Sequence, residues 1–447
     1  MKLKSGIVVA AGILFATFTD CAAEDSLPQE ARVALRKATE YFRSIATNGG
    51  YAGIYSLDLK ERYGEAVYEK AKATEIWVQP PGTPTVGQCY LRAWKATGDA
   101  YYLDAARDVA RALVWGQRAA GGWDHRVDVA HLTADAARVE RKTGRCSFDD
   151  RVTQGALEFL IDADQAIDEA WLDEAMELGL RFMLQSQFEN GAWPQWYPLR
   201  GGYHDYYTFN DSAINTCISL MLKAHTVYGK DAYLLSARKG GDFIIASQLP
   251  APQAGWAQQY SHDMKPAWAR AFEPAGLSSA ATSRNIRTLI ELYLYTQDGR
   301  YLVPIPAAIT WLNDSMLGEH LWARLYEVET NRPIYGDRTD GNKVFYDYEK
   351  VSKRERTSYA WRGEYGIEST IRNYERVAGM GAAAFEEASQ APTAAQRAAR
   401  ARGMADRVQS IIDALDAEGR WVRDDQITCQ TFTGNVSVLC DYLECVR

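Results

Sequence analysis

The chain has 447 residues, 47% of them hydrophobic and 24% charged, and a formal net charge of −8. This is the composition of a globular protein with enough residues for one large domain or two to three small ones. The negative charge argues against a general polyanion binder, so no nucleic-acid partner is expected. It still permits an anionic substrate held by a local cluster of Arg, Lys and a metal ion.

The N-terminus has the pattern of a cleavable export signal. Lys2 and Lys4 form a basic segment, an apolar segment covers 6–18, and a small-residue cleavage site precedes Glu24. We therefore interpret residues 1–23 as a signal peptide and expect a secreted or periplasmic protein. The apolar segment is too short to span a bilayer, so no stable membrane association is expected.

Six cysteines remain after the signal. An even number in an oxidising compartment permits disulfides, with Cys429, Cys440 and Cys445 as the first candidates. Cys217 lies in an apolar helical pattern and is expected to be a buried thiol. No CxxC pair or histidine cluster indicates zinc.

The middle of the chain repeats one unit at a spacing of roughly 60 to 70 residues. Each unit is a helix, a short turn such as TGDAYYL, YGKDAYL or TQDGRYL, a second helix, and a loop with Gly and Trp. Helices are expected over 28–46, 86–97, 101–118, 153–164, 171–188, 211–228, 233–248, 283–296 and 301–312. Such hairpins stack side by side, which predicts an all-α dominated fold, an incomplete (α/α) toroid with its Gly-Trp loops on one rim.

The C-terminal part departs from this repeat. Alternating apolar residues over 334–346, around an Asp-Gly pair, predict a small β-hairpin. The segment 382–395 is rich in Ala, Glu, Ser and Pro and is expected to be a mobile link. Residues 394–417 predict a final amphipathic helix. We expect residues 24–380 to form the main domain, with residues 381–447 packed on it as a helix and tail.

Two Asp-led helix starts lie about one repeat apart, SFDDRV with Asp149 and Asp150, and TFND with Asp211. In a stacked array they fall at the same end of neighbouring hairpins, where their carboxylates could converge. Paired carboxylate oxygens suit a hard cation such as Ca²⁺. The alternative is that each Asp only caps its own helix.

A third cluster is cationic and lies between Gly255 and Arg287. It contains Lys265, Arg270, Arg284 and Arg287. Arg284 and Arg287 share one helix face near a helix start, where cations oppose the helix dipole. This arrangement indicates a nearby anion, which is either an anionic ligand or a protein carboxylate such as Glu273 or Glu291.

Several motifs together resemble the family 10 polysaccharide lyases, the pectate lyases of the α/α-toroid type. They are GAWPQWYPLRGGY…TFND, GWAQQY…MKPAWARAFEP…LS and TNRPIYGDR, supported by GGWDHRVD and SFDDRVTQGALEFL. The resemblance covers roughly residues 30–370. It implies an exported, monomeric pectate lyase that cleaves polygalacturonate by Ca²⁺-assisted β-elimination.

The resemblance also implies roles for individual residues. Asp149 and Asp211 would serve the metal, although Asp150 could replace Asp149. Arg287 would be the Brønsted base, because the family usually shows Gly where Arg284 stands. The substrate-binding residues would be Lys265, Arg270, Arg284, Trp193 and Arg200.

Two other functions fit the same residues. One is a glycoside hydrolase on an α/α scaffold, which would use Asp149 and Asp211 as its carboxylate pair. The other is a non-catalytic binder of acidic glycans. Ca²⁺ dependence and an unsaturated product would distinguish a lyase from both.

Overall fold

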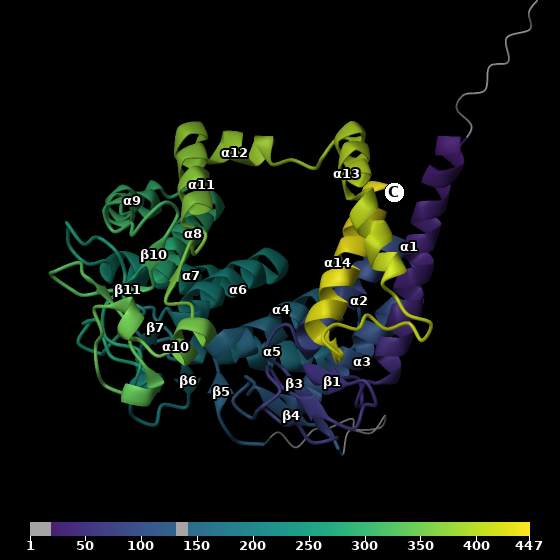
Figure 1. Cartoon of the computed structure of the whole chain (residues 1–447), viewed down its shortest axis with the longest axis horizontal. Helices are drawn as coiled ribbons and strands as arrows, with labels where there is room; N and C mark the ends of the chain where they lie inside the picture. Colours follow the sequence, from purple (N-terminus) through teal and green to yellow (C-terminus); the bar gives the residue numbers. More distant parts are fainter. Residues whose placement is uncertain (1–18, 131–141) are drawn as a thin grey trace, which may run out of the picture.

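The structure is a computed structural model that describes residues 19–130 and 142–447. Helical hairpins dominate it, as the sequence repeat predicts (Figure 1). The helices are α1 (Thr19–Ser44), α2 (Thr83–Thr97), α3 (Ala100–Gly116), α4 (Val152–Asp164), α5 (Ala170–Gln185), α6 (Ala213–Tyr228), α7 (Asp231–Ala246), α8 (Ser279–Thr296), α9 (Ile305–Asp314), α10 (Lys353–Ser358), α11 (Ile367–Met380), α12 (Ala382–Ala388), α13 (Ala394–Asp413) and α14 (Cys429–Cys445).

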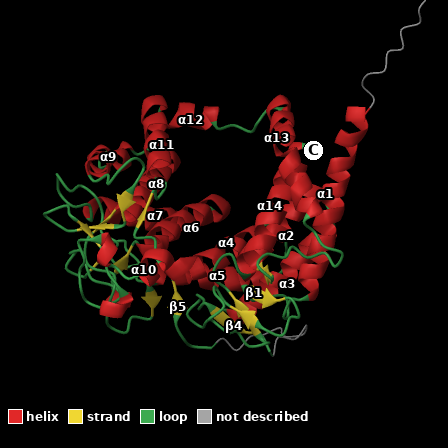
Figure 2. Ribbon diagram, in the orientation of Figure 1, coloured by secondary structure: helices red, strands yellow, loops and turns green. Residues whose placement is uncertain are grey.

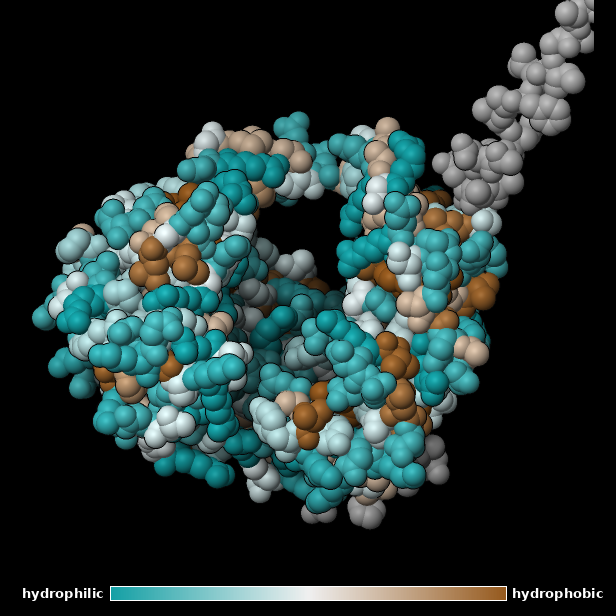
Figure 3. All heavy atoms as spheres, in the orientation of Figure 1, coloured by the Kyte–Doolittle hydropathy of each residue, from teal (hydrophilic) through white to brown (hydrophobic). Residues whose placement is uncertain are grey.

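The helices form an incomplete (α/α) toroid, which confirms the predicted fold class. Helices α2, α4, α6, α8 and α11 pack against one another in that order, and α3, α5 and α7 each pack on their own hairpin partner. Helix α14 packs on α1 and α2, so the two ends of the described chain meet. Between α11 and α13 only α12 and a loop span the ring (Figure 1). Figure 3 shows the resulting central opening, surrounded mostly by hydrophilic residues.

Short antiparallel ladders connect the loops of neighbouring hairpins (Figure 2). The pairs are β1 with β14 and β2, β3 with β4, β5 with β6, β7 with β8, β11 with β9 and β12, and β10 with β13. The strands are β1 (Ile54–Ser56), β2 (Arg62–Tyr63), β3 (Glu75–Trp77), β4 (Arg126–Asp128), β5 (Cys146–Ser147), β6 (Trp196–Tyr197), β7 (Tyr207–Thr208), β8 (Gln259–Tyr260), β9 (Leu277–Ser278), β10 (Trp322–Ala323), β11 (Leu325–Tyr326), β12 (Pro333–Ile334), β13 (Arg362–Gly363) and β14 (Gln426–Thr428). Because strands β5, β7 and β9 lead into α4, α6 and α8, the ladders fix the loops at the starts of these helices.

The tryptophans of the Gly-Trp loops are core residues. Trp123, Trp193, Trp256 and Trp322 are buried, and each indole N–H donates to a carbonyl near the end of the preceding helix, at Leu113, Met183, Ile244 and Leu312 respectively. The repeated Trp therefore ties each loop to its own hairpin. The expectation that Trp193 binds substrate is wrong, because a side chain with no exposed surface cannot stack on a sugar.

The predicted disulfides are absent from the described residues. All six cysteines are free there, and five of them are buried. Cys429 donates its thiol to the Ala52 carbonyl at 3.1 Å, and Cys440 lies in the apolar face of α14. Cys217 is a buried thiol, as expected. Burial raises the pKa of Cys429, Cys440 and Cys217 above that of an ordinary thiol.

The C-terminal part differs from the sequence-based expectation in three places. The ladder of the predicted hairpin lies earlier, between β11 and β12, and residues 335 and 345 form only an isolated bridge. The expected mobile link contains α12. Helices α11 and α14 were not predicted; in α14, Thr, Gly and Cys interrupt the apolar pattern. The predicted signal peptide falls largely outside the described residues.

Residues 381–447 pack through α14 on α1 and α2. Within 19–130 and 142–447, no helix has the length and apolarity needed to cross a membrane.

Candidate functional site

The site begins with a backbone motif that occurs twice on the rim, once before α4 and once before α6. In both copies a Phe is followed by a three-residue 3₁₀ turn, and the last two residues of that turn have positive φ. These are Asp150 (φ 49°) and Arg151 (φ 60°) in the first copy, and Asp211 (φ 48°) and Ser212 (φ 62°) in the second. Side chains rarely adopt this left-handed conformation, which costs roughly 1 kcal/mol or more at each residue. A backbone strained twice in the same way indicates a local function.

This motif shows that the two aspartates do not cap their helices. Helices α4 and α6 begin at Val152 and Ala213, and neither has a side-chain cap. The alternative of two independent N-caps is therefore wrong. The superposable backbone makes Asp150 the counterpart of Asp211, and Asn210 the counterpart of Asp149.

Three carboxylates meet at this corner. Asp149, Asp150 and Asp211 each place one oxygen within 4.8 Å of the other two. Asp149 is only 6% exposed, and its Oδ1 is buried without a hydrogen-bond partner among the described residues. Burial and the neighbouring carboxylates raise the pKa of Asp149 and of Asp211. This arrangement is costly unless a cation is present. An unpaired buried oxygen and three hard-oxygen donors fit Ca²⁺.

Two arginines lie against this cluster. Arg270 places Nη2 3.6 Å from Asp149 Oδ2 and Nη1 3.5 Å from Glu273 Oε1. Arg324 is buried and donates to Asn210 Oδ1 at 3.0 Å and to Gln258 Oε1 at 3.1 Å. The sequence predicted Arg270 as a substrate-binding residue but predicted no role for Arg324. The only signal for Arg324 was a lone cation in the apolar run WARLY.

Arg284 and Arg287 lie three residues apart on α8 and differ from Arg270. Arg284 is half-buried and lies in the field of Asp211, whereas Arg287 is more exposed and lies in the field of Arg284. Neither guanidinium has an ion pair or a side-chain hydrogen bond in the described part of the chain. Burial lowers the pKa of both. The charges of Arg324 and Arg287 lower the pKa of Arg284 further, whereas the charge of Asp211 raises it. The alternative partners are engaged elsewhere, because Glu273 contacts Arg270, and Glu291 accepts from Ser219 at 2.6 Å.

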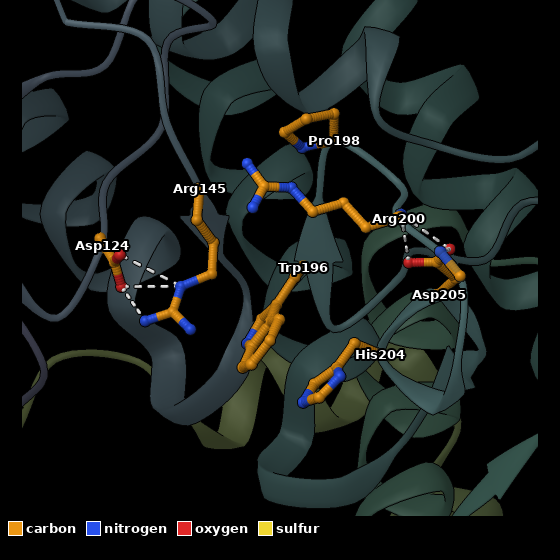
Figure 4. Close-up of a pocket in the computed structure, with 8 residues that line it drawn as sticks. Asp124, Arg145, Trp196, Pro198, Arg200, His204 and Asp205 are labelled. Carbon is orange, nitrogen blue, oxygen red and sulfur yellow. Dashed lines mark hydrogen bonds and ion pairs between the residues drawn. The ribbon is translucent and has the colours of Figure 1, made fainter.

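Two other predicted substrate-binding residues lie apart from the carboxylates. Lys265 is exposed in the loop after β8, and no contact in the described structure ties its ammonium to the aspartates. Arg200 is exposed in the loop after β6 and lines a neighbouring pocket of about 320 Å³ (Figure 4). The structure therefore brings Asp149, Asp211, Arg270 and Arg284 together, and leaves Lys265 outside that group.

His125 connects this pocket with the aspartates. Its Nδ1 lies 3.3 Å from Asp124 Oδ1, and its Nε2 lies 3.9 Å from Asp150 Oδ2. Although burial opposes the charge, the two carboxylates raise the pKa of His125 to about 9. Asp124 also accepts three hydrogen bonds from Arg145, at 2.7–3.2 Å. The motif GGWDHRVD contains Asp124 and His125, but no role for either side chain was predicted.

The sequence of this chain matches one known protein family. The sequence profile of the family described as pectic acid lyase matches residues 117–319 and 313–369. These residues include both copies of the strained motif and all the arginines above. A search of curated proteins finds no match.

Two solved structures of a family 10 polysaccharide lyase from Cellvibrio cellulosa are similar to this chain. One is a mutant in complex with trigalacturonic acid, with a TM-score of 0.51 and 23% identity over 65% of this chain and 98% of that one. The other has a TM-score of 0.50 and 23% identity over 66% of this chain and 97% of that one. At 23% identity, this similarity shows a shared fold and nothing finer.

Proposed function

Because the chain belongs to the pectic acid lyase family, we propose that it is an exported pectate lyase that cleaves polygalacturonate by β-elimination. Membership of this family assigns the general activity, that of a polysaccharide lyase. The substrate, the metal and the base are our proposals. One observation supports them most, namely three converging carboxylates in whose field lies Arg284, a guanidinium without an ion pair in the described part of the chain. The trigalacturonic acid bound to the similar Cellvibrio protein agrees with an acidic substrate.

Asp149, Asp150 and Asp211 would hold Ca²⁺, since their donors and the unpaired Asp149 Oδ1 fit that ion. When bound, Ca²⁺ would neutralise the substrate carboxylate and stabilise the negative charge that develops on it. Arg284 lies in the field of Asp211 and is suited to bind that carboxylate as well. Arg270 is held by Asp149 and Glu273, so it would orient the cluster and present its remaining N–H groups to the sugar.

Arg287 is our candidate for the base that removes the C5 proton. A guanidinium must be neutral to accept a proton, and its ordinary pKa exceeds about 12. Burial lowers the pKa of Arg287, and no carboxylate opposes that shift, in contrast to Arg284. As the proton leaves C5, the C5–C4 double bond forms, and the C4–O bond breaks with its electrons going to the leaving oxygen. The reaction should therefore favour alkaline pH.

The glycoside hydrolase alternative fits the geometry poorly. Hydrolases place their two carboxyl groups about 5–9.5 Å apart, on either side of the scissile bond. Here three aspartates gather their oxygens within 4.8 Å of one another, so they form one cluster and not a pair that faces across a sugar.

Product analysis on polygalacturonate tests this function. With Ca²⁺ at high pH we expect unsaturated, ultraviolet-absorbing oligogalacturonates, and a chelator should stop their formation. Saturated reducing ends without ultraviolet absorbance would indicate a hydrolase. Binding without any product would indicate a non-catalytic glycan binder.

Export is the part of the proposal that rests on the sequence alone. The basic and apolar segments within residues 1–23 support a cleaved signal. Mass spectrometry of the protein recovered outside the cytoplasm should give a mature chain that begins near Glu24. An intact Met1 would contradict this.

A further inference from the structure

The pocket beside the aspartates has the composition of a second binding site for an acidic sugar. It is lined by Asp124, Arg145, Trp196, Pro198, Arg200, Gly201, His204 and Asp205. It lies one ladder away from the strained motif, because β5 leads to Asp149 and pairs with β6, which contains Trp196. A polymer that occupies the aspartate corner would pass near this pocket.

The two arginines of the pocket differ in how they are held. Asp124 binds Nε and Nη2 of Arg145, and the guanidinium lies over the Trp196 ring at 4.2 Å. Its Nη1 has no hydrogen-bond partner within the described chain. Arg145 is thus fixed in place by its neighbours, with one N–H face left for a ligand.

Arg200 is the unpaired cation of this pocket. Its backbone N–H and that of Gly201 donate to the Asp205 carboxylate at 2.5–3.1 Å, so Asp205 holds the loop and is not a partner of the guanidinium. No ion pair involves Arg200 within residues 19–130 and 142–447. Figure 4 shows its side chain extending from this anchored backbone across the pocket, on the side of Pro198 and Arg145.

The aromatic residues form the apolar part of the pocket. Trp196 and His204 stack with ring centroids 3.4 Å apart and planes 14° from parallel. Burial, together with the charges of Arg145 and Arg270, lowers the pKa of His204 to about 4, so the ring is neutral near neutral pH. Arg145 covers one face of Trp196 and His204 covers the other, while Tyr203 lies against His204 with ring centroids 3.8 Å apart. The stack is therefore a rigid wall that presents ring edges to a sugar, next to guanidinium groups that can bind its carboxylate.

We propose that the pocket of Arg145, Trp196 and Arg200 is a distal subsite that binds one uronate of the polymer, with Arg200 as its carboxylate-binding residue. This rests on the proposed function for the identity of the sugar. The subsite would act in binding the chain and would take no part in the elimination. It also gives the enzyme a preference for an unesterified uronate at that position, since a methyl ester removes the charge that Arg200 binds.

Calorimetric binding in Ca²⁺-free buffer tests the subsite, with product formation followed in parallel. The probes are hexagalacturonate, its methyl ester and digalacturonate. Arg200→Gln should weaken hexagalacturonate binding by on the order of 5- to 20-fold, as expected for the loss of one charge-assisted contact. The loss should be smaller for digalacturonate, and Arg200→Lys should restore part of the affinity. Wild type should bind the methyl ester at least as weakly as Arg200→Gln binds hexagalacturonate, and Arg200→Gln should not weaken binding of the ester further.

The control is Arg238→Gln, which removes an exposed arginine from α7. If Arg200→Gln and Arg238→Gln bind hexagalacturonate equally well, the subsite is wrong while the proposed lyase stands. If wild type neither binds nor cleaves galacturonate chains, the proposed function is wrong and the subsite falls with it. The two failures are therefore distinguishable.

Discussion

Among single residues, Arg284 and Arg287 have different roles in the elimination that we propose. Arg287→Ala should lower kcat on polygalacturonate by about 10²–10⁴-fold, the usual contribution of a general base, while oligogalacturonate affinity changes much less. Arg284→Ala should mainly raise KM, because we assign that side chain to the substrate carboxylate. Initial rates of double-bond formation measure both variants.

The reverse pattern would exchange the two roles. If Arg284→Ala loses kcat and Arg287→Ala changes only KM, Arg284 is the base. A wild-type kcat in both variants would remove arginine from the proton transfer.

The pH dependence of activity follows from the same side chains. Burial lowers the pKa of Arg287, so the neutral fraction of its guanidinium grows as the pH rises towards that value. We therefore expect kcat/KM to rise through the alkaline range in saturating Ca²⁺. A rate that falls steadily above neutral pH would contradict an arginine base.

Asp337, in the TNRPIYGDR segment, gives a prediction about stability at acid pH. Although burial opposes the shift, hydrogen bonds from Thr339 and Ser352 lower the pKa of Asp337 to about 2. Because the folded-state pKa is depressed, this carboxylate stabilises the fold above its ordinary pKa of 3.8, and the contribution disappears as the pH falls from about 4 through 2.

Asp337→Asn should therefore lower the free energy of unfolding by about 1–3 kcal/mol at neutral pH, and the difference from wild type should shrink below pH of about 4. Denaturant titrations across pH measure it. A difference that does not vary with pH would mean that the carboxylate charge is not what Thr339 and Ser352 stabilise.

Among the secondary-structure elements, the Gly-Trp loop recurs after each helical hairpin and connects it to the next one. Gly191 has φ of 95°, and a Cβ there would lie 2.0 Å from the Lys239 carbonyl oxygen of the adjacent helix. Gly191→Ala should destabilise the protein by about 2 kcal/mol or more. Gly229→Ala is the matched control, since Gly229 also has positive φ but nothing lies within 4 Å of a Cβ there, so it should cost only about 1 kcal/mol.

Thermal or denaturant unfolding compares the two glycine variants. Equal losses would mean that only the backbone angle matters at Gly191, and that the close approach of the loop to α7 does not constrain the structure.

The sequence predicted these elements unequally well. The hairpins followed from their apolar periodicity and their turns, because local rules determine both. The repeat also predicted that Asp149 or Asp150 would converge with Asp211. The positive φ of Asp150 and Asp211 could not be predicted, since an Asp before an apolar run has the pattern of an N-cap and only tertiary packing holds it in this conformation. Arg324 and Trp193 could not be placed correctly for the same reason, because tertiary packing decides which side chains reach the site and which are buried. The arginine in an apolar run contacts the site, and the tryptophan in an exposed-looking loop is core.

At the scale of the whole molecule, the C-terminal segment closes the ring against its first helices. Phe432 of α14 stacks on Phe42 of α1 with ring centroids 4.0 Å apart, and both side chains are buried. Phe432→Ala should cost about 3–5 kcal/mol and lower the Tm of one global transition. A separate early transition, with the main Tm unchanged, would show that residues 381–447 form an independent unit.

The toroid brings functional residues from distant parts of the sequence to one corner. Asp150 precedes α4, Asp211 precedes α6, and Arg287 lies on α8, so three successive hairpins would supply the proposed metal site and the proposed base. This placement follows from the stacking of the hairpins, and the ladders between β5 and β6 and between β7 and β8 fix its register.

We propose that Asp149 and Asp150 of one hairpin and Asp211 of the next act together through one divalent ion. The most direct test is the Ca²⁺ dependence of double-bond formation by wild type and by Asp211→Asn at alkaline pH. We predict that wild type is inactive with chelator and saturates with Ca²⁺, whereas Asp211→Asn needs at least about tenfold more Ca²⁺ or loses activity, as the loss of one charged ligand implies. Full activity of wild type in the presence of chelator, or the same Ca²⁺ requirement for wild type and Asp211→Asn, would show that these carboxylates do not act through a divalent ion.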